Sequence, residues 1–237
     1  MIAVALLGLA KGGFSGMGAL SLPLMAMTIS PVRAAAILLP ILIVQDVVGV
    51  WAFRRTWDGR VLGWMLPGAA LGIGLGWWYA ASVSPDAVLG LVGAVSILFG
   101  GYRLWADRRG TPAAASRSPG WVGSLFGVAS GFTSQIAHAG GPPFQLWVLP
   151  RRLERDVLVG TTAIFFAVVN WVKVPAYFAL GQFTLANMTV AALLLPVAIA
   201  STLAGVWLVR RVSAARFYTA VYVLMILVGV KLVLDTC

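Results

Sequence analysis

Charged residues are scarce in this chain: only 10% of its 237 residues are Asp, Glu, Lys or Arg, whereas a typical soluble domain has about 25%. Hydrophobic residues make up 60% of the chain, and the shortage of charge runs along its whole length. So few charges cannot cover the surface of a soluble globule. The composition therefore excludes a cytosolic enzyme, a nucleic-acid-binding module and a disordered protein, and it indicates an integral membrane protein.

Acidic residues and cysteine are scarcer still. The chain has 7 acidic residues against 17 Lys and Arg, a net charge of +10, and a single cysteine, Cys237. One cysteine excludes a disulfide framework. The basic residues lie in short loops between apolar runs, where they set the orientation of a membrane protein instead of binding nucleic acid. We therefore expect the lipid bilayer as a partner, and no nucleic acid, metal or cofactor.

Six apolar segments have the length of about 20 residues that a helix needs to cross a bilayer. They are residues 33–53, 61–82, 86–106, 157–180, 187–209 and 216–234. The longest hydrophilic stretch, 107–120, contains prolines and serines and is predicted to be a cytoplasmic linker between two halves of the chain.

Two further apolar segments, 1–29 and 121–149, are interrupted by glycine and proline. The first contains the run Lys11-Gly12-Gly13-Phe14-Ser15-Gly16, and the second contains Gly140-Gly141-Pro142-Pro143. Such runs break a continuous helix. Irregular backbone at membrane depth persists only where it is buried in protein or lines a cavity, so both segments are predicted to be broken helical hairpins.

The two broken segments correspond to each other. Gly13-Phe14-Ser15 in the first matches Gly131-Phe132-Thr133 in the second, and three apolar spans follow each segment. The sequence therefore predicts two repeats, residues 1–106 and 121–237, each a broken hairpin followed by three membrane-spanning helices. The expected fold is an all-α integral membrane protein.

The positions of the basic loops predict how the two repeats are oriented. Both the linker and the loop with Arg151, Arg152 and Arg155 are basic, and basic loops lie on the cytoplasmic side. The segment 121–149 between them must then enter and leave the membrane on one face, as a re-entrant hairpin. With three crossings in each unit, the repeats have inverted topology, as in many secondary transporters. We expect the linker and the Arg-rich loops inside and both chain termini outside.

The two breaks are predicted to face each other and to bind an anion, because a helix that starts inside the membrane presents free N–H groups and the positive end of its dipole. The candidate substrate-binding residues are Lys11, Gly12, Gly13, Phe14, Ser15 and Gly16 in the first break, and Gly131, Phe132, Thr133, Ser134, Gln135, His138, Gly140, Gly141 and Pro142 in the second. Lys11 either complements the anion or extends to the membrane surface. His138 donates to the anion, carries a proton, or is a packed, hydrogen-bonded histidine.

Four polar residues in the predicted spans are candidates for coupling transport to protons or sodium, or for structural support. They are Gln45, Asp46, Asn170 and Lys173. Ionisable side chains are costly within a bilayer and are functional candidates by default. Asp46 and Lys173 are expected to pair with each other, with proton relay through Asp46 as the alternative.

The paired units, the run from Lys11 to Gly18 and its counterpart around Gly131 and Gly140-Gly141-Pro142-Pro143 resemble the sulfite exporter TauE/SafE family of bacterial permeases. The resemblance covers essentially the whole chain, although the histidine and the paired prolines of the second break depart from it. It implies a permease of the bacterial inner membrane that moves sulfite or an organosulfonate such as sulfoacetate, usually outward, by alternating access.

Two other functions stay open at this point. Gly13-Phe14-Ser15-Gly16 fits the Gly-x-Ser-Gly pattern of rhomboid proteases, in which Ser15 would be the nucleophile and His138 its base. The second copy of the pattern, at Gly131, argues against a unique nucleophile. The other alternative is a membrane subunit without transport activity, packed through small residues.

Overall fold

The computed structural model is helical throughout the residues that it describes, which are 1–12, 17–82, 84–109, 118–208 and 215–235. The elements are α1 (Ile2–Lys11), η1 (Met17–Leu20), α2 (Ser21–Ala26), α3 (Pro31–Phe53), α4 (Gly59–Ser82), α5 (Pro85–Arg109), α6 (Gly120–Ala137), α7 (Gly141–Val148), η2 (Leu149–Arg151), α8 (Arg155–Ala179), α9 (Leu185–Leu208) and α10 (Ala215–Leu234). This confirms the expected all-α class for that part of the chain.

Within the described ranges, four helices are long and apolar enough to cross a membrane: α3, α4, α8 and α9. Their starts follow local rules. For example, Ser30 caps α3 by accepting a hydrogen bond from Arg33 N, and Pro31 occupies the first turn. Helices α5 and α10 lie where the spans 86–106 and 216–234 were expected, and their crossing of the membrane stays a prediction.

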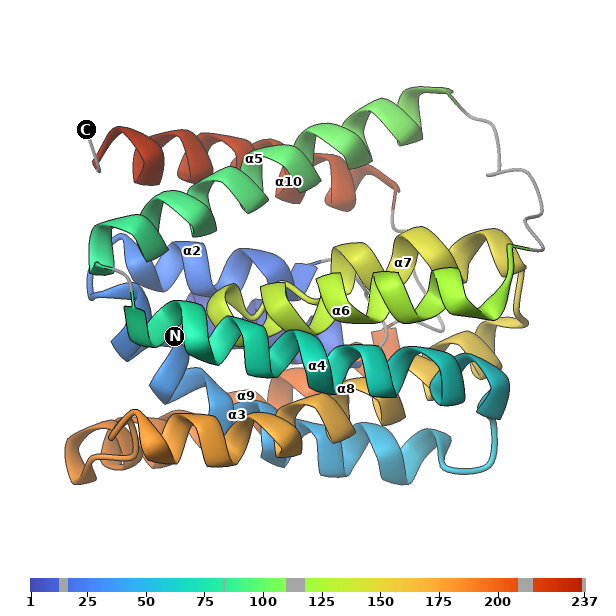
Figure 1. Cartoon of the computed structure of the whole chain (residues 1–237), viewed down its shortest axis with the longest axis horizontal. Coiled ribbons are helices and arrows are strands. Elements are labelled where there is room, and N and C mark those ends of the chain that lie inside the picture. The colour runs from blue at the N-terminus through green and yellow to red at the C-terminus, as the bar shows by residue number, and fades with distance from the viewer. Residues whose placement is uncertain (13–16, 83, 110–117, 209–214, 236–237) are drawn as a thin grey trace.

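The helices lie roughly along one axis and form layers (Figure 1). Helices α5 and α10 pack together at one side of the molecule, and α3, α8 and α9 lie at the opposite side. The short elements α2 and α7 lie between these layers, with α6 beside them. The interrupted segments therefore occupy the interior of the fold.

Both segments expected to be broken are interrupted. Helix α1 ends at Lys11, and η1 and α2 pack back against it. Helix α6 ends at His138, whose backbone is left-handed with φ 48° and ψ 24°. The N–H of His138 donates to Ser134 O and the N–H of Ala139 donates to Thr133 O, so two of the last helical carbonyls keep a hydrogen-bond partner. The chain resumes as α7 at Gly141, followed by two prolines that suit a helix start.

Each broken segment packs on a long helix of the other half of the chain. Helix α1 lies along α9, and α6 lies along α4. Glycines make these contacts close: a Cβ placed on Gly12 would lie 2.5 Å from the backbone of Gly205, and one on Gly131 would lie 2.1 Å from Ala69 O. Small residues that allow backbones to approach are typical of helix packing in membranes.

Several basic loops meet at one end of the molecule. Arg151 donates from Nη2 to Ser118 O at 2.9 Å, so the chain from 119 to 150 returns to the end where it began. The N–H of Asp58 donates to Thr161 Oγ1 at 2.9 Å, which places the α3–α4 loop, with Arg54 and Arg55, beside the start of α8. These connections lie at the right in Figure 1.

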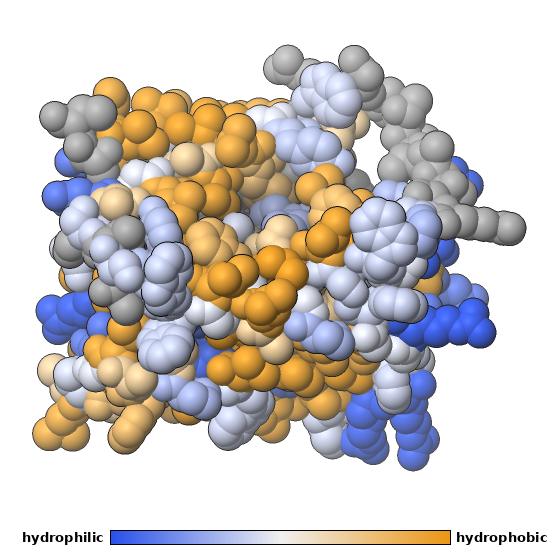
Figure 2. All heavy atoms as spheres, viewed as in Figure 1, coloured by the Kyte–Doolittle hydropathy of each residue, from blue (hydrophilic) through white to orange (hydrophobic). Residues whose placement is uncertain are grey.

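The surface suits a lipid environment. Large apolar side chains point outward, among them Trp51, Trp78 and Trp171, which are 61–70% exposed. Figure 2 shows apolar residues across the middle of the face in view and the most hydrophilic residues toward the ends of the long axis. This distribution matches a protein with an apolar belt between two polar rims.

Candidate solute-binding site

A cavity of about 210 Å³ lies where the two broken segments meet α3 and α8. The first segment contributes Lys11 and Gly18, and the second contributes residues at and around its break. The described lining residues are Leu7, Ala10, Lys11, Gly18, Leu42, Asp46, Gly49, Ser134, His138, Gly141, Pro142, Gln145, Leu158, Val159, Thr162, Ala163, Phe166 and Asn170. The cavity thus brings together both breaks and several intramembrane polar residues in one place.

A neutral ion pair forms one part of the wall. The Nζ of Lys11 donates to Asp46 Oδ1, and Asn170 Nδ2 donates to Asp46 Oδ2 at 2.6 Å. Lys11 also lies over the Phe166 ring, with Nζ 5.6 Å from its centroid. Both carboxylate oxygens of Asp46 are therefore occupied, and its negative charge is balanced by Lys11.

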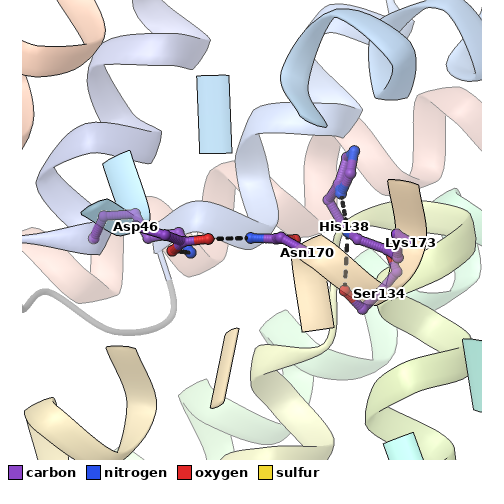
Figure 3. A network of polar contacts seen from close by, with 6 residues as sticks. Asp46, Ser134, His138, Asn170 and Lys173 are labelled. Carbon is purple, nitrogen blue, oxygen red and sulfur yellow. Dashed lines mark hydrogen bonds and ion pairs between the residues drawn. The ribbon is translucent and has the colours of Figure 1, made fainter. Parts of the chain in front are cut away.

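A second polar cluster, behind the opposite wall, contains Lys173 (Figure 3). Its Nζ donates to Ser134 O and Ser134 Oγ, both at 3.2 Å, and lies 2.8 Å from His138 Nδ1. Lys173 is completely buried. Among the residues that the structure describes, no carboxylate forms an ion pair with it. Its amino nitrogen is therefore surrounded by neutral hydrogen-bond partners in that part of the chain.

His138 connects three parts of the site. Its Nε2 lies 3.0 Å from Ala35 O in α3, and its ring stacks on Tyr177 of α8 with centroids 6.1 Å apart. A carbonyl oxygen only accepts hydrogen bonds, so Nε2 carries a proton. With Lys173 charged and donating to Nδ1, the imidazole is neutral. The ring is therefore fixed in orientation while one of its faces remains available to the cavity.

The balance of charge around the cavity is positive. Among the described residues, the charges of Lys11 and Asp46 cancel, and Lys173 has no carboxylate partner. The neutral donors at the wall are the Ser134 hydroxyl, which accepts from Lys173 and has no acceptor for its own proton among the described residues, and the Gln145 amide. The first turn of α7 adds little, because Pro142 and Pro143 lack N–H groups. The arrangement suits a small anion bound mainly by side chains.

The structure brings some of the predicted site residues together at this cavity. Those that line it are Lys11, Ser134, His138, Gly141 and Pro142, together with Asp46 and Asn170, and Lys173 lies directly behind Ser134 and His138. Four predicted residues, Gly13, Phe14, Ser15 and Gly16, lie outside the described residues.

The other predicted residues serve packing or hydrogen bonding away from the cavity. Gly12 and Gly131 pack on helices of the opposite half, and Phe132 contacts Tyr79 with ring centroids 5.8 Å apart. Thr133 donates to Ala129 O and Ala139 O, and Gln45 donates to Ala198 O. The backbone oxygens of Gln135 and Gly140 accept hydrogen bonds from Tyr177 and Ser130, respectively. They pack against other helices or form hydrogen bonds within their own segment instead of lining the cavity.

The expected pairing of Asp46 with Lys173 is wrong. Asp46 pairs with Lys11 and Asn170, whereas Lys173 bonds to Ser134 and His138. The reason is that the ends of the broken helices insert between α3 and α8, and each supplies a nearer partner to one of the two charges.

Among the lining residues that the sequence did not predict are Gln145, Thr162 and Phe166. Gln145 is only 7% exposed, and it lines the cavity. It lies four residues after Gly141, hence on the same face of α7. A lone amide in an eight-residue apolar helix was the signal that could have found it.

Comparison with known proteins gives one match. The family model described as "Sulfite exporter TauE/SafE" matches residues 1–232. No curated protein and no solved structure matches the chain.

Proposed function

Because the chain belongs to the sulfite exporter TauE/SafE family, whose members are membrane transporters of sulfur anions and not enzymes, we propose that it moves sulfite or a small organosulfonate such as sulfoacetate across the bacterial inner membrane. We propose secondary transport in the outward direction. Family membership removes the protease alternative, and with it the nucleophile role of Ser15 and the base role of His138.

The observation that carries the anion assignment is the buried Lys173, which has no carboxylate partner in the part of the chain that the structure describes. An uncompensated charge in a protein interior is costly. Ser134 and His138 separate it from the cavity by one layer of side chains and bond to it directly. An anion in the cavity supplies the missing negative charge, whereas a cation or a neutral solute does not.

We further propose alternating access between inverted repeats 1–106 and 121–237, around hairpins 1–29 and 121–149, with 107–120 as the linker. The helix contacts support this, because they occur in corresponding pairs. Helix α1 on α9 corresponds to α6 on α4, and α3 on α9 corresponds to α8 on α4. The bond between Arg151 and Ser118 supports a hairpin that returns to one face.

For a carrier that moves the anion alone, the outward direction follows from charge. An inside-negative potential drives a monovalent anion outward with about 2.3 kcal/mol per 100 mV, which corresponds to roughly a fiftyfold concentration ratio. The proposed topology, with the linker and Arg-rich loops in the cytoplasm and both termini outside, orients the protein in this field. The meeting of the basic loops at one end supports this topology.

The test is sulfite binding and transport by the purified protein and two leucine variants. Gly141 lines the cavity with nothing within 4 Å of a Cβ, so the side chain of Gly141→Leu starts in open space and is expected to fill the cavity. Gly74 on α4 has equally open surroundings but does not line the cavity, so Gly74→Leu is the matched control.

We expect sulfite to raise the melting temperature of the wild type and of Gly74→Leu, by preferential binding to the folded state, and not that of Gly141→Leu. In proteoliposomes, we expect the wild type and Gly74→Leu to transport sulfite and Gly141→Leu not to transport it. The proposed function is wrong if sulfite and sulfonates neither shift unfolding nor cross the membrane, and the cavity assignment is wrong if Gly141→Leu transports like the wild type.

A further inference from the structure

His138 and Lys173 face each other through two nitrogen atoms. Nζ of Lys173 lies 2.8 Å from Nδ1 of His138, and the far ring nitrogen, Nε2, lies 3.0 Å from Ala35 O. A contact of this length between two nitrogens requires one to donate and the other to accept. Because Ala35 O only accepts, Nε2 keeps its proton in every state, and only the proton between Nζ and Nδ1 changes position.

The contact accommodates one positive charge. With one charging proton, either Lys173 is an ammonium beside a neutral imidazole, or His138 is an imidazolium beside a neutral amine. With two, both nitrogens become donors, and the contact is lost to repulsion between like charges. With none, the hydrogen bond survives but the site has no charge to hold an anion. The pair therefore acts as a single proton site.

We propose that the His138–Lys173 pair carries one proton with each monovalent anion, so that the protein is a proton–anion symporter. This rests on the proposed function of the cavity. The proton leaves water on the side from which the anion enters, resides on the pair as the counter-charge, and returns to water on the other side when the anion leaves. Each cycle thus moves one proton and one anion and no net charge, and the pair returns neutral.

The neighbouring titratable groups do not replace the pair in this role. Lys11 from α1 and Asp46 from α3 act on it electrostatically, but they are bound to each other and their charges cancel. Tyr177 stacks on the His138 ring and donates its hydroxyl proton to Gln135 O. Asn170, Gln145 and Ser134 are neutral at every working pH. The proton shared by His138 and Lys173 is the variable one.

A symporter differs sharply from an uncoupled exporter in what drives it. An electroneutral cycle does not respond to the membrane potential, so the concentration gradients of the anion and of the proton set its direction, which is outward where the anion accumulates inside. Instead, a difference of one pH unit shifts the accumulation of anion about tenfold. An uncoupled carrier of a monovalent anion shifts about fiftyfold per 100 mV and ignores the pH gradient.

The experiment measures accumulation of radiolabelled sulfite and methanesulfonate in proteoliposomes. Methanesulfonate stays a monovalent anion at every pH used, so any proton that crosses with it is carried by the protein and not by the solute. A pH gradient is imposed without a potential, and a potassium potential with valinomycin is imposed without a pH gradient. We expect the wild type to respond to the pH gradient, about tenfold per unit, and not to the potential.

The diagnostic variant is His138→Asn. Asparagine tolerates the left-handed backbone at this position, and its amide oxygen accepts a hydrogen bond from Lys173 but does not titrate. Lys173 then has no ring nitrogen with which to share its proton, so we expect anion flux to follow the potential and to lose its dependence on the pH gradient. The readout is the ratio of the two responses, which is independent of the total flux. Lys231→Met, in α10 and paired with Asp235 at the surface, is the control and keeps the wild-type ratio.

The possible results separate the two proposals. Flux of the wild type that follows the potential and ignores the pH gradient overturns the symport inference and leaves anion transport intact. Flux of neither anion overturns both proposals. If His138→Asn keeps the wild-type ratio, the proton is carried elsewhere and its assignment to this pair is wrong.

Discussion

The two broken segments have similar packing but different charge. The first ends α1 at Lys11, whose ammonium pairs with Asp46 of α3. The second ends α6 at His138, a neutral ring that bonds to Lys173 of α8. In the first half the intramembrane charges cancel, whereas in the second half one positive charge remains. We propose that the difference between the halves, and not a feature they share, gives the cavity a preference for anions.

What the halves share is the means of packing. Gly12 on the first segment lies against Gly205 of α9, and Gly131 on the second lies against Ala69 of α4. Each broken segment is thus held by a helix of the other half, and its end is brought to the cavity. Packing fixes the position of both ends, while a few side chains decide what binds there.

Removing the charge of Lys173 is the strongest test of the difference between the two halves. We expect Lys173→Met to weaken sulfite binding about a hundredfold, because one charge at an effective dielectric constant of about 20 and a separation of about 6 Å contributes roughly 3 kcal/mol. Calorimetric titration of the purified variant measures this. Folding is expected to survive, since replacing a buried charge with an apolar side chain of similar length is often tolerated.

Lys231→Met serves as the matched control, because this lysine near the end of α10 is exposed and pairs with Asp235. Its sulfite affinity should equal that of the wild type. If folded Lys173→Met binds sulfite with wild-type affinity, the second half does not determine the charge of the solute that the cavity binds. The anion assignment would then lose its main support.

Making the first half resemble the second is expected to have a smaller and opposite effect. Asp46→Asn removes the negative charge, frees Lys11 at the cavity wall and keeps an amide partner for Asn170. We expect sulfite to bind about tenfold more tightly, corresponding to about 1.4 kcal/mol. The same titration measures it, with Asn170→Asp as the reversed case, in which the added negative charge should weaken binding. Weaker binding in Asp46→Asn would mean that the ion pair organises the cavity more than it neutralises it.

The sequence predicted the helices and the two breaks well, because hydropathy and glycine–proline runs are local signals. It did not predict the partners of the charges. Asp46 lies in α3 and Lys173 in α8, the first long helix after each break, so their corresponding positions favour a pair. The ends of α1 and α6 insert between them and supply other partners. The role of Gly131 was missed for a related reason. A glycine beside a break looks the same in sequence whether it faces a ligand or, as here, the backbone of Ala69.

The smallest effect on anion binding is expected at Gly131, and it separates packing from recognition. A Cβ there would lie 2.1 Å from Ala69 O, so Gly131→Ala forces α4 and α6 apart and is expected to cost about 1–3 kcal/mol of stability. Gly74→Ala on α4 meets nothing within 4 Å and should leave the melting temperature almost unchanged. At temperatures where both variants are folded, their sulfite affinities should match the wild type, because neither residue lines the cavity. A Gly131→Ala protein that melts normally but binds sulfite poorly would restore this glycine to the binding site and would place recognition on the α4 side of α6.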